Sequence, residues 1–228
     1  MSLTAAMPRG LSLRGLLLPA LLAAIAAGVI VTVLQQIFLE PLILQAENLE
    51  LGRDLHAATE LDISRAAYTL LFSCLGAFGY GLLLAACYAL HGDVTPKAGL
   101  LWGLAGFASF AFAPALGLPP ELPGTQAADL VARQLWWVLT AATTAAGLAF
   151  IAFSRPLALR LLGVVVIAAP HIAGAPQVSE AHSGVPAQMI HAFVLGSLAI
   201  SASMWVILAV ATAALMKSLT ISGTTMKR

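Results

Sequence analysis

The sequence predicts an all-α membrane protein, a bundle of six transmembrane helices, or five if the shortest apolar run does not cross. Of its 228 residues, 60% are hydrophobic and only 9% are charged, whereas soluble domains average about 25% charged residues. So few charges cannot cover the surface of a soluble globule. A membrane-spanning helix needs roughly 20 mostly apolar residues. The runs that reach or approach this length are residues 15–39, 66–90, 98–116, 135–153, 157–169 and 190–216.

The charged loops favour six spans over five, because cytoplasmic loops carry an excess of Lys and Arg. With six spans and both termini cytoplasmic, eight of the eleven basic residues lie inside, and of the ten acidic residues only Asp93 does. With five spans, the basic tail at residues 217–228 would lie outside. The eight inner basic residues are Arg9, Arg14, Lys97, Arg155, Arg160, Lys217, Lys227 and Arg228.

The fifth run, residues 157–169, is short and ends at Pro170-His171. It could be a full span, a re-entrant segment or a buried half-helix. The first run is too long for the apolar core of a signal peptide, so we expect an uncleaved span. The whole chain, residues 1–228, is expected to form one integral membrane domain.

Small residues recur at helical spacing in two of the runs, which favours close helix packing in a membrane. These residues are Ala24, Gly28 and Thr32 in the first run, and Gly99, Gly103 and Gly106 in the third. Cys74 and Cys87 share one predicted helix about 20 Å apart, too far for a disulfide. We therefore expect both to be core residues.

A proline-rich segment, residues 119–124, leads into the fourth apolar run. Thr125 is expected to cap the helix that follows, with Asp129 in its first turn. Asp129 and Arg133 stand four residues apart and can pair on one helix face. Trp136 and Trp137 suit the membrane interface. These structural roles leave Glu121 and Gln134 unexplained.

Imidazole and carboxylate groups gather on the predicted outer side, and both ligate divalent first-row metals. No tight ligand spacing such as a Cys pair accompanies them, so a solvated or structural role stays open for each histidine. Likewise, an amide pair at the end of the first run either packs against a neighbouring helix or contacts substrate. The predicted metal ligands are His171, Glu121, Glu40 and His182. The predicted substrate-path or structural polar residues are Gln35, Gln36, Glu47, Arg133 and Gln134.

Several distinctive stretches follow one another along the chain: Gln35-Gln36, residues 45–47 (QAE), 99–107 (GLLWGLAGF), 118–124 (LPPELPG), 133–137 (RQLWW) and 170–176 (PHIAGAP). Together and in this order they resemble the CbtA family of bacterial cobalt transporter subunits. The resemblance implies cobalt uptake linked to cobalamin synthesis. It also implies a partner, CbtB, a small single-span membrane protein with a histidine-rich end.

We therefore expect a subunit of a divalent metal uptake system in the bacterial inner membrane. The alternative is a membrane scaffold that assembles or stabilises the small partner without transporting metal. No nucleophile and base are arranged for catalysis, so no enzyme and no resident cofactor are expected. The net charge of +1 argues against nucleic acid, which needs a clustered basic face. The expected partners are the lipid bilayer, a CbtB-like subunit and the transported Co²⁺ or a similar divalent cation.

Overall fold

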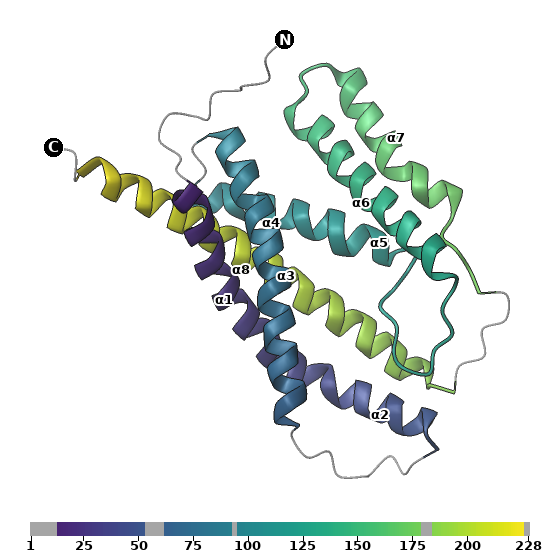
Figure 1. Cartoon of the computed structure of the whole chain (residues 1–228). Coiled ribbons are helices and arrows are strands. Elements are labelled where there is room, and N and C mark those ends of the chain that lie inside the picture. The colour runs from purple at the N-terminus through teal and green to yellow at the C-terminus, as the bar shows by residue number, and fades with distance from the viewer. Residues whose placement is uncertain (1–12, 53–61, 93–94, 179–183, 226–228) are drawn as a thin grey trace. The chain divides into compact units, whose positions relative to one another are not determined.

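The computed structural model describes residues 13–52, 62–92, 95–178 and 184–225, and every regular element in these ranges is a helix (Figure 1). Within these ranges, five helices are long and apolar enough to cross a membrane. They are Leu13–Phe38, Ile63–His91, Pro96–Ala115, Leu130–Phe153 and Ala187–Ser218. The prediction of an all-α bundle with five or six spans is confirmed. The fifth predicted run forms a shorter helix, α7 (Leu157–Ala173), of 17 residues.

The five membrane-spanning segments begin and end within about five residues of the predicted runs, although helix α8 itself continues beyond its apolar span to Thr225. In Figure 1 they are α1 (Leu13–Phe38), α3 (Ile63–His91), α6 (Leu130–Phe153), α8 (Ala187–Thr225) and a composite third span. The third span consists of α4 (Pro96–Phe107), a π-helical turn (Ala108–Phe112) and α5 (Ala113–Ala115). A further helix, α2 (Glu40–Glu50), follows α1.

Aspartates cap two of these helices at their N-termini. Asp62 accepts hydrogen bonds from the backbone N–H groups of Ser64 and Arg65 at the start of α3. Asp129 accepts one from Ala132 at 2.9 Å at the start of α6. The expectation that Thr125 caps this helix is wrong, because residues 126–128 are not helical and the Thr125 hydroxyl donates to the Leu122 carbonyl instead.

The chain divides into two compact units. The first comprises residues 1–33, 62–104 and 203–228, and the second comprises residues 34–61 and 105–202. The first unit therefore takes most of α1, all of α3, most of α4 and the second half of α8. The second unit holds α2, the π turn, α5, α6, α7 and the first half of α8.

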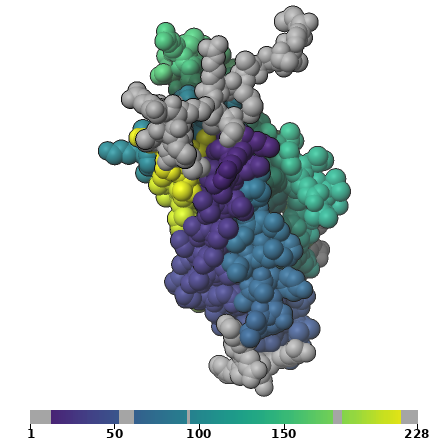
Figure 2. All heavy atoms as spheres, turned by 60° about the vertical axis from the view of Figure 1, so that its left-hand side comes forward, coloured from purple at the N-terminus to yellow at the C-terminus, as the bar shows by residue number. Residues whose placement is uncertain are grey.

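In the first unit, α1 and α3 lie side by side (Figure 2) and meet through small residues. A methyl group added to Gly28 of α1 would lie 2.5 Å from the Cys74 sulfur of α3, and one added to Gly81 of α3 would lie 3.2 Å from the Ala20 carbonyl oxygen of α1. These distances leave no room for a larger side chain. The predicted small face of the first run is thus a packing face, with Ala24, Gly28 and Thr32 all buried. Both cysteines are free, as expected.

The face of α8 formed by residues 205–213 is the centre of the first unit. Trp205, Leu208, Ala209 and Ala213 are at most 1% exposed. Gly103 of α4 lies against this face, since an added methyl would come within 2.8 Å of the Trp205 carbonyl oxygen. The small residues predicted in the third run therefore let α4 approach α8.

Tyr88 joins α3 to the same face of α8. Its side chain is 2% exposed, and its hydroxyl donates a hydrogen bond to the Ala209 carbonyl at 3.0 Å. We expect Tyr88→Phe to lower the free energy of unfolding by about 1 kcal/mol, because one buried hydrogen bond is lost. Thermal unfolding of the purified protein in detergent measures this, with Tyr68→Phe as control because Tyr68 on the same helix is 64% exposed. Equal melting temperatures for the two variants would contradict the prediction.

In the second unit, α6 and α7 form a tight antiparallel pair around two glycines. A methyl group added to Gly147 would lie 2.5 Å from the Gly163 carbonyl oxygen, and one added to Gly163 would lie 2.6 Å from the Gly147 carbonyl oxygen. At the other end of the pair, the Trp136 indole N–H donates to the Pro170 carbonyl at 3.3 Å. The two helices are therefore in contact along most of the length of α7.

Helix α7 continues past the predicted end at residue 169 and stops at Ala173. Proline lacks the N–H that would bond to the carbonyl four residues earlier, but its own carbonyl still accepts bonds. The Gly174 N–H donates to the Pro170 carbonyl at 3.1 Å, and Gly174 has φ = +86°, which favours glycine. Pro170 therefore lies inside the last turn of the helix.

Candidate functional site

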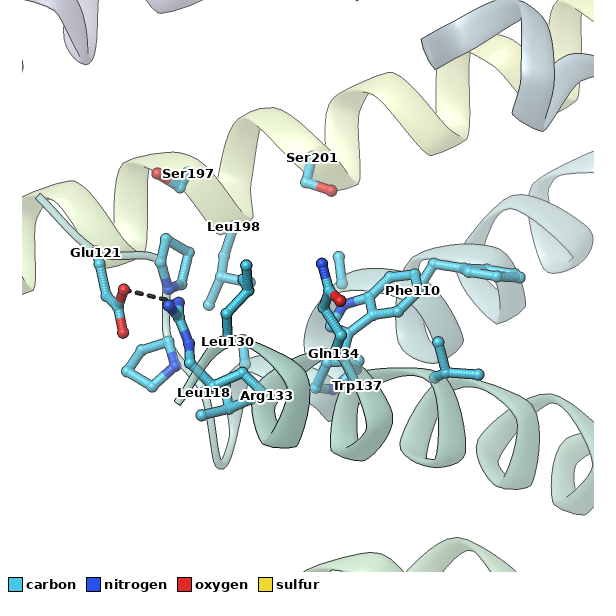
Figure 3. A pocket seen from close by; sticks show the side chains of 16 residues that line it. Phe110, Leu118, Glu121, Leu130, Arg133, Gln134, Trp137, Ser197, Leu198 and Ser201 are labelled. Carbon is cyan, nitrogen blue, oxygen red and sulfur yellow. Dashed lines mark hydrogen bonds and ion pairs between the residues drawn. The ribbon is translucent and has the colours of Figure 1, made fainter. Parts of the chain in front are cut away.

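A cavity of about 630 Å³ lies within the second unit (Figure 3). Its walls come from the π turn, α5, the proline-rich loop, α6 and the first half of α8. The volume lies in the usual range for small-molecule sites, roughly 300–1,000 Å³. The apolar or aromatic side chains that line it are Phe110, Ala111, Pro114, Ala115, Leu118, Pro119, Pro120, Leu130, Trp137, Val138 and Leu198.

The polar side chains that line the cavity are Glu121, Arg133, Gln134, Ser197 and Ser201. Glu121 and Arg133 point toward one another in Figure 3, and the Arg133 Nη2 lies 2.7 Å from the Glu121 Oε2. Their side chains are 31% and 27% exposed respectively, so solvent reaches both. The cavity thus combines one carboxylate, one guanidinium, one amide and two hydroxyls.

The loop before α6 holds Glu121 in place. Pro119 and Pro120 restrict the backbone dihedrals just before it. The next residue, Leu122, is only 3% exposed, and its carbonyl accepts a 2.6 Å hydrogen bond from the Thr125 hydroxyl. Gly124 turns the chain with φ = +75°. Glu121 is therefore anchored on a constrained segment.

Arg133 projects from the first turn of α6 toward Glu121, not toward Asp129. The expected Asp129–Arg133 pair is wrong because the Asp129 carboxylate caps the helix through the Ala132 N–H. The Arg133 Nε is buried and has no hydrogen-bond partner among the residues that the structure describes. The guanidinium therefore pairs with Glu121 through Nη2, while its Nε lacks a described hydrogen-bond acceptor.

His171, in the last turn of α7, packs against a different face of α6 from the one that lines the cavity. Its ring packs edge-to-face against Trp136, with the ring centroids 5.8 Å apart. Trp136 is 8% exposed and faces α7, whereas Trp137 lines the cavity. Consecutive helical residues point about 100° apart. The structure therefore brings Glu121, Arg133 and Gln134 together and places His171 apart from them.

The other predicted site residues do not line the cavity. Glu40 is the first residue of α2, and Glu47 lies in its last turn. Gln35 and Gln36 lie in the last turn of α1, and the Gln36 side-chain nitrogen is buried without a partner among the described residues. His182 falls outside the described residues. In the described ranges, no three His, Cys, Asp or Glu side chains are grouped so that they could hold a metal ion.

Sequence reasoning missed the contributions of the third span and of α8 to this cavity. The π turn carries Phe110 and Ala111 into its wall. At this turn the Ala113 N–H bonds to the Ala108 carbonyl, five residues back. Pro114 was a usable signal, since a proline inside a helix disturbs the preceding turn. Ser197 and Ser201, four residues apart on α8, were a second signal, because this spacing puts both on one helix face.

A family model described as "Probable cobalt transporter subunit (CbtA)" matches residues 13–217. No curated protein and no solved structure matches the chain. The family description and the five long apolar helices together identify a multi-pass membrane protein that acts in cobalt transport. Because the match covers nearly the whole chain, the protein belongs to the CbtA family.

Proposed function

We propose that this protein is the subunit through which Co²⁺ or a similar divalent cation enters, in an uptake system of the bacterial inner membrane that serves cobalamin synthesis. The observation that carries the proposal is the family match over residues 13–217. A small CbtB-like membrane subunit is the proposed partner. The Co²⁺ ion is the cargo, and neither a resident cofactor nor catalysis is part of the proposal.

The cavity in the second unit supports this role. Carboxylate, amide and hydroxyl oxygens suit a cation that keeps part of its water shell, and Glu121, Gln134, Ser197 and Ser201 supply them. A conduit needs a site from which the ion can also leave. A single carboxylate beside neutral oxygens meets this requirement better than a closed cage of ligands.

The charge distribution supports inward movement. In the proposed topology, nine of the ten acidic residues and only three of the eleven basic ones lie on the outer side. An acidic surface raises the local concentration of cations. Glu121 lies in the loop between the third long span and α6, so the cavity would open toward this outer side. His171, Glu40 and His182 remain proposed ligands along the same route.

The proposal is tested by uptake of radiolabelled Co²⁺ into cells that lack their own importers. The chain is expressed alone, with its small partner, and as Glu121→Ala with the partner. Loss of a charged contact costs roughly 1.5–3 kcal/mol, so we expect uptake by Glu121→Ala to fall about tenfold or more. The control is Glu50→Ala, because Glu50 is exposed and does not line the cavity.

The conduit is supported if uptake requires the chain and is lost in Glu121→Ala but not in Glu50→Ala, with the variants present at equal levels in the membrane. Absence of uptake from every combination would overturn the cobalt proposal. Equal uptake by both variants would overturn the assignment of this cavity.

The scaffold function remains the second candidate because no three-ligand metal group occurs among the described residues. His171→Ala separates the two functions. A conduit with His171 on the ion route loses uptake while it still co-purifies with the small partner. If the protein is a scaffold, His171→Ala is expected to lose co-purification with the small partner. Metal uptake would then persist in cells that lack this chain.

A further inference from the structure

We propose that Arg133 is a built-in competitor for the Glu121 carboxylate, which an entering divalent cation displaces and which later helps to expel that cation. The inference rests on the proposed function, because it assigns a step of ion passage to the same cavity. It concerns the residue that sets how tightly the ion is held there.

The ion pair is of a kind that exchanges readily. One contact joins the partners, Arg133 Nη2 to Glu121 Oε2 at 2.7 Å, rather than the two parallel bonds that an arginine fork can make. Each side chain is about 30% exposed, so water screens the attraction and the pair is weak. Water is also available to solvate the guanidinium when it leaves.

The two partners differ in how freely they move. Glu121 follows two prolines and precedes the buried Leu122, so its backbone is constrained and its carboxylate is shorter-tethered than the guanidinium. Arg133 is a long side chain on the first turn of α6, and its buried Nε has no hydrogen-bond partner in the described part of the chain. Reorientation of the guanidinium therefore breaks one described side-chain contact and lets Nε reach water or another acceptor.

The difference in charge favours the divalent cation over the Arg133 guanidinium as the partner of the Glu121 carboxylate. Among the described residues that line the cavity, Glu121 is the one acid and Arg133 the one base, so the cavity is neutral at rest. At equal distance a divalent cation gains twice the Coulomb attraction to the carboxylate that a guanidinium gains. The cation therefore displaces Arg133 when its concentration is sufficient.

Release of the cation follows from the covalent attachment of Arg133 to α6. The displaced guanidinium stays attached to α6, so its effective concentration near Glu121 remains high. It also repels the bound cation. The outcome is a site of moderate affinity that recovers its ion pair after each passage, which is what conduction requires.

The test is equilibrium dialysis of ⁵⁷Co²⁺ against the full-length protein in lipid nanodiscs. We expect Arg133→Gln to bind Co²⁺ about fivefold more tightly, which is the upper range for a partly exposed ion pair. Arg133→Lys keeps the competing charge and is expected to bind as the wild type does. Arg133→Met serves as a second uncharged variant of similar length if Arg133→Gln does not purify as a folded protein.

Arg155→Gln is the matched control. Arg155 is exposed and does not line the cavity, so this variant removes the same net charge without removing the competitor. Tighter binding by Arg133→Gln and not by Arg155→Gln supports the competition. In cells, the same Arg133 variant is expected to reach half-maximal uptake at lower Co²⁺ while its maximal rate falls.

Glu121→Gln distinguishes this inference from the proposed function. If Glu121→Gln abolishes binding while Arg133→Gln binds as the wild type or more weakly, competition is overturned and the cation site stands. If Glu121→Gln binds Co²⁺ as the wild type does, the cavity is not the cation site, so the competition and the assignment of this cavity both fail, whereas the cobalt uptake function is decided by the uptake experiment.

Discussion

Gly147→Leu is expected to separate α6 from α7 and to lower the free energy of unfolding by about 3 kcal/mol. A methyl group alone at this position would lie 2.5 Å from both the Gly163 carbonyl oxygen and a side-chain carbon of Ile167. The carbonyl is backbone and cannot rotate away, so α7 as a whole must move. In a protein of this size the change corresponds to a fall in melting temperature of about 10 °C.

Gly76→Leu provides the matched control for this prediction. Gly76 also lies within a long helix, α3, but an added methyl there would meet nothing within 4 Å. Thermal unfolding of both variants in the same detergent gives the comparison. If Gly147→Leu and Gly76→Leu have the same melting temperature, α6 and α7 do not make the close contact described above.

Trp205→Ala is expected to cause the largest loss of stability in the first unit, about 3–5 kcal/mol. The Trp205 side chain is 1% exposed, and its ring lies 4.6 Å from the Tyr80 ring, centroid to centroid. Removal of the indole leaves a cavity between α8 and α3, because neighbouring backbones can fill it only in part. Purification yield and melting temperature in detergent measure the loss.

Phe72→Ala is the control, since Phe72 is an aromatic residue on α3 that is 67% exposed. Trp205→Phe should recover part of the lost stability, because it retains a ring beside Tyr80. A melting temperature for Trp205→Ala equal to that of Phe72→Ala would show that the indole is not part of a packed core.

The helices could be predicted because each depends on local features of the chain. Apolar length defines a span wherever it occurs, and the small residues at Gly28 and Gly103 were identified as packing positions before their neighbours were known. Helix caps are also local, but two candidate residues were present. Asp129 rather than Thr125 caps α6, and that choice removed the expected partner of Arg133.

The candidate site could be predicted only in part because it depends on contacts between distant segments. Glu121 and Gln134 were singled out because no structural role explained them, and both line the cavity. Ser197 and Ser201 follow Gln134 by more than 60 residues in the sequence, and nothing local indicates that the first half of α8 lies beside α6. The orientation of Trp136 and Trp137 was equally hidden, yet it separates His171 from Glu121.

The π turn at Ala108–Phe112 has a consequence for variation in this chain. A turn closed over five residues contains one residue more than the α-helical bonding pattern requires. Deletion of one residue there would restore the α-helical bonding pattern ahead of Pro114 and would leave the following residues pointing nearly as they do now, because the wider turn has already absorbed the extra residue. A one-residue deletion is therefore expected to be tolerated at this turn, whereas in a regular part of an α-helix it would rotate every following residue by about 100°.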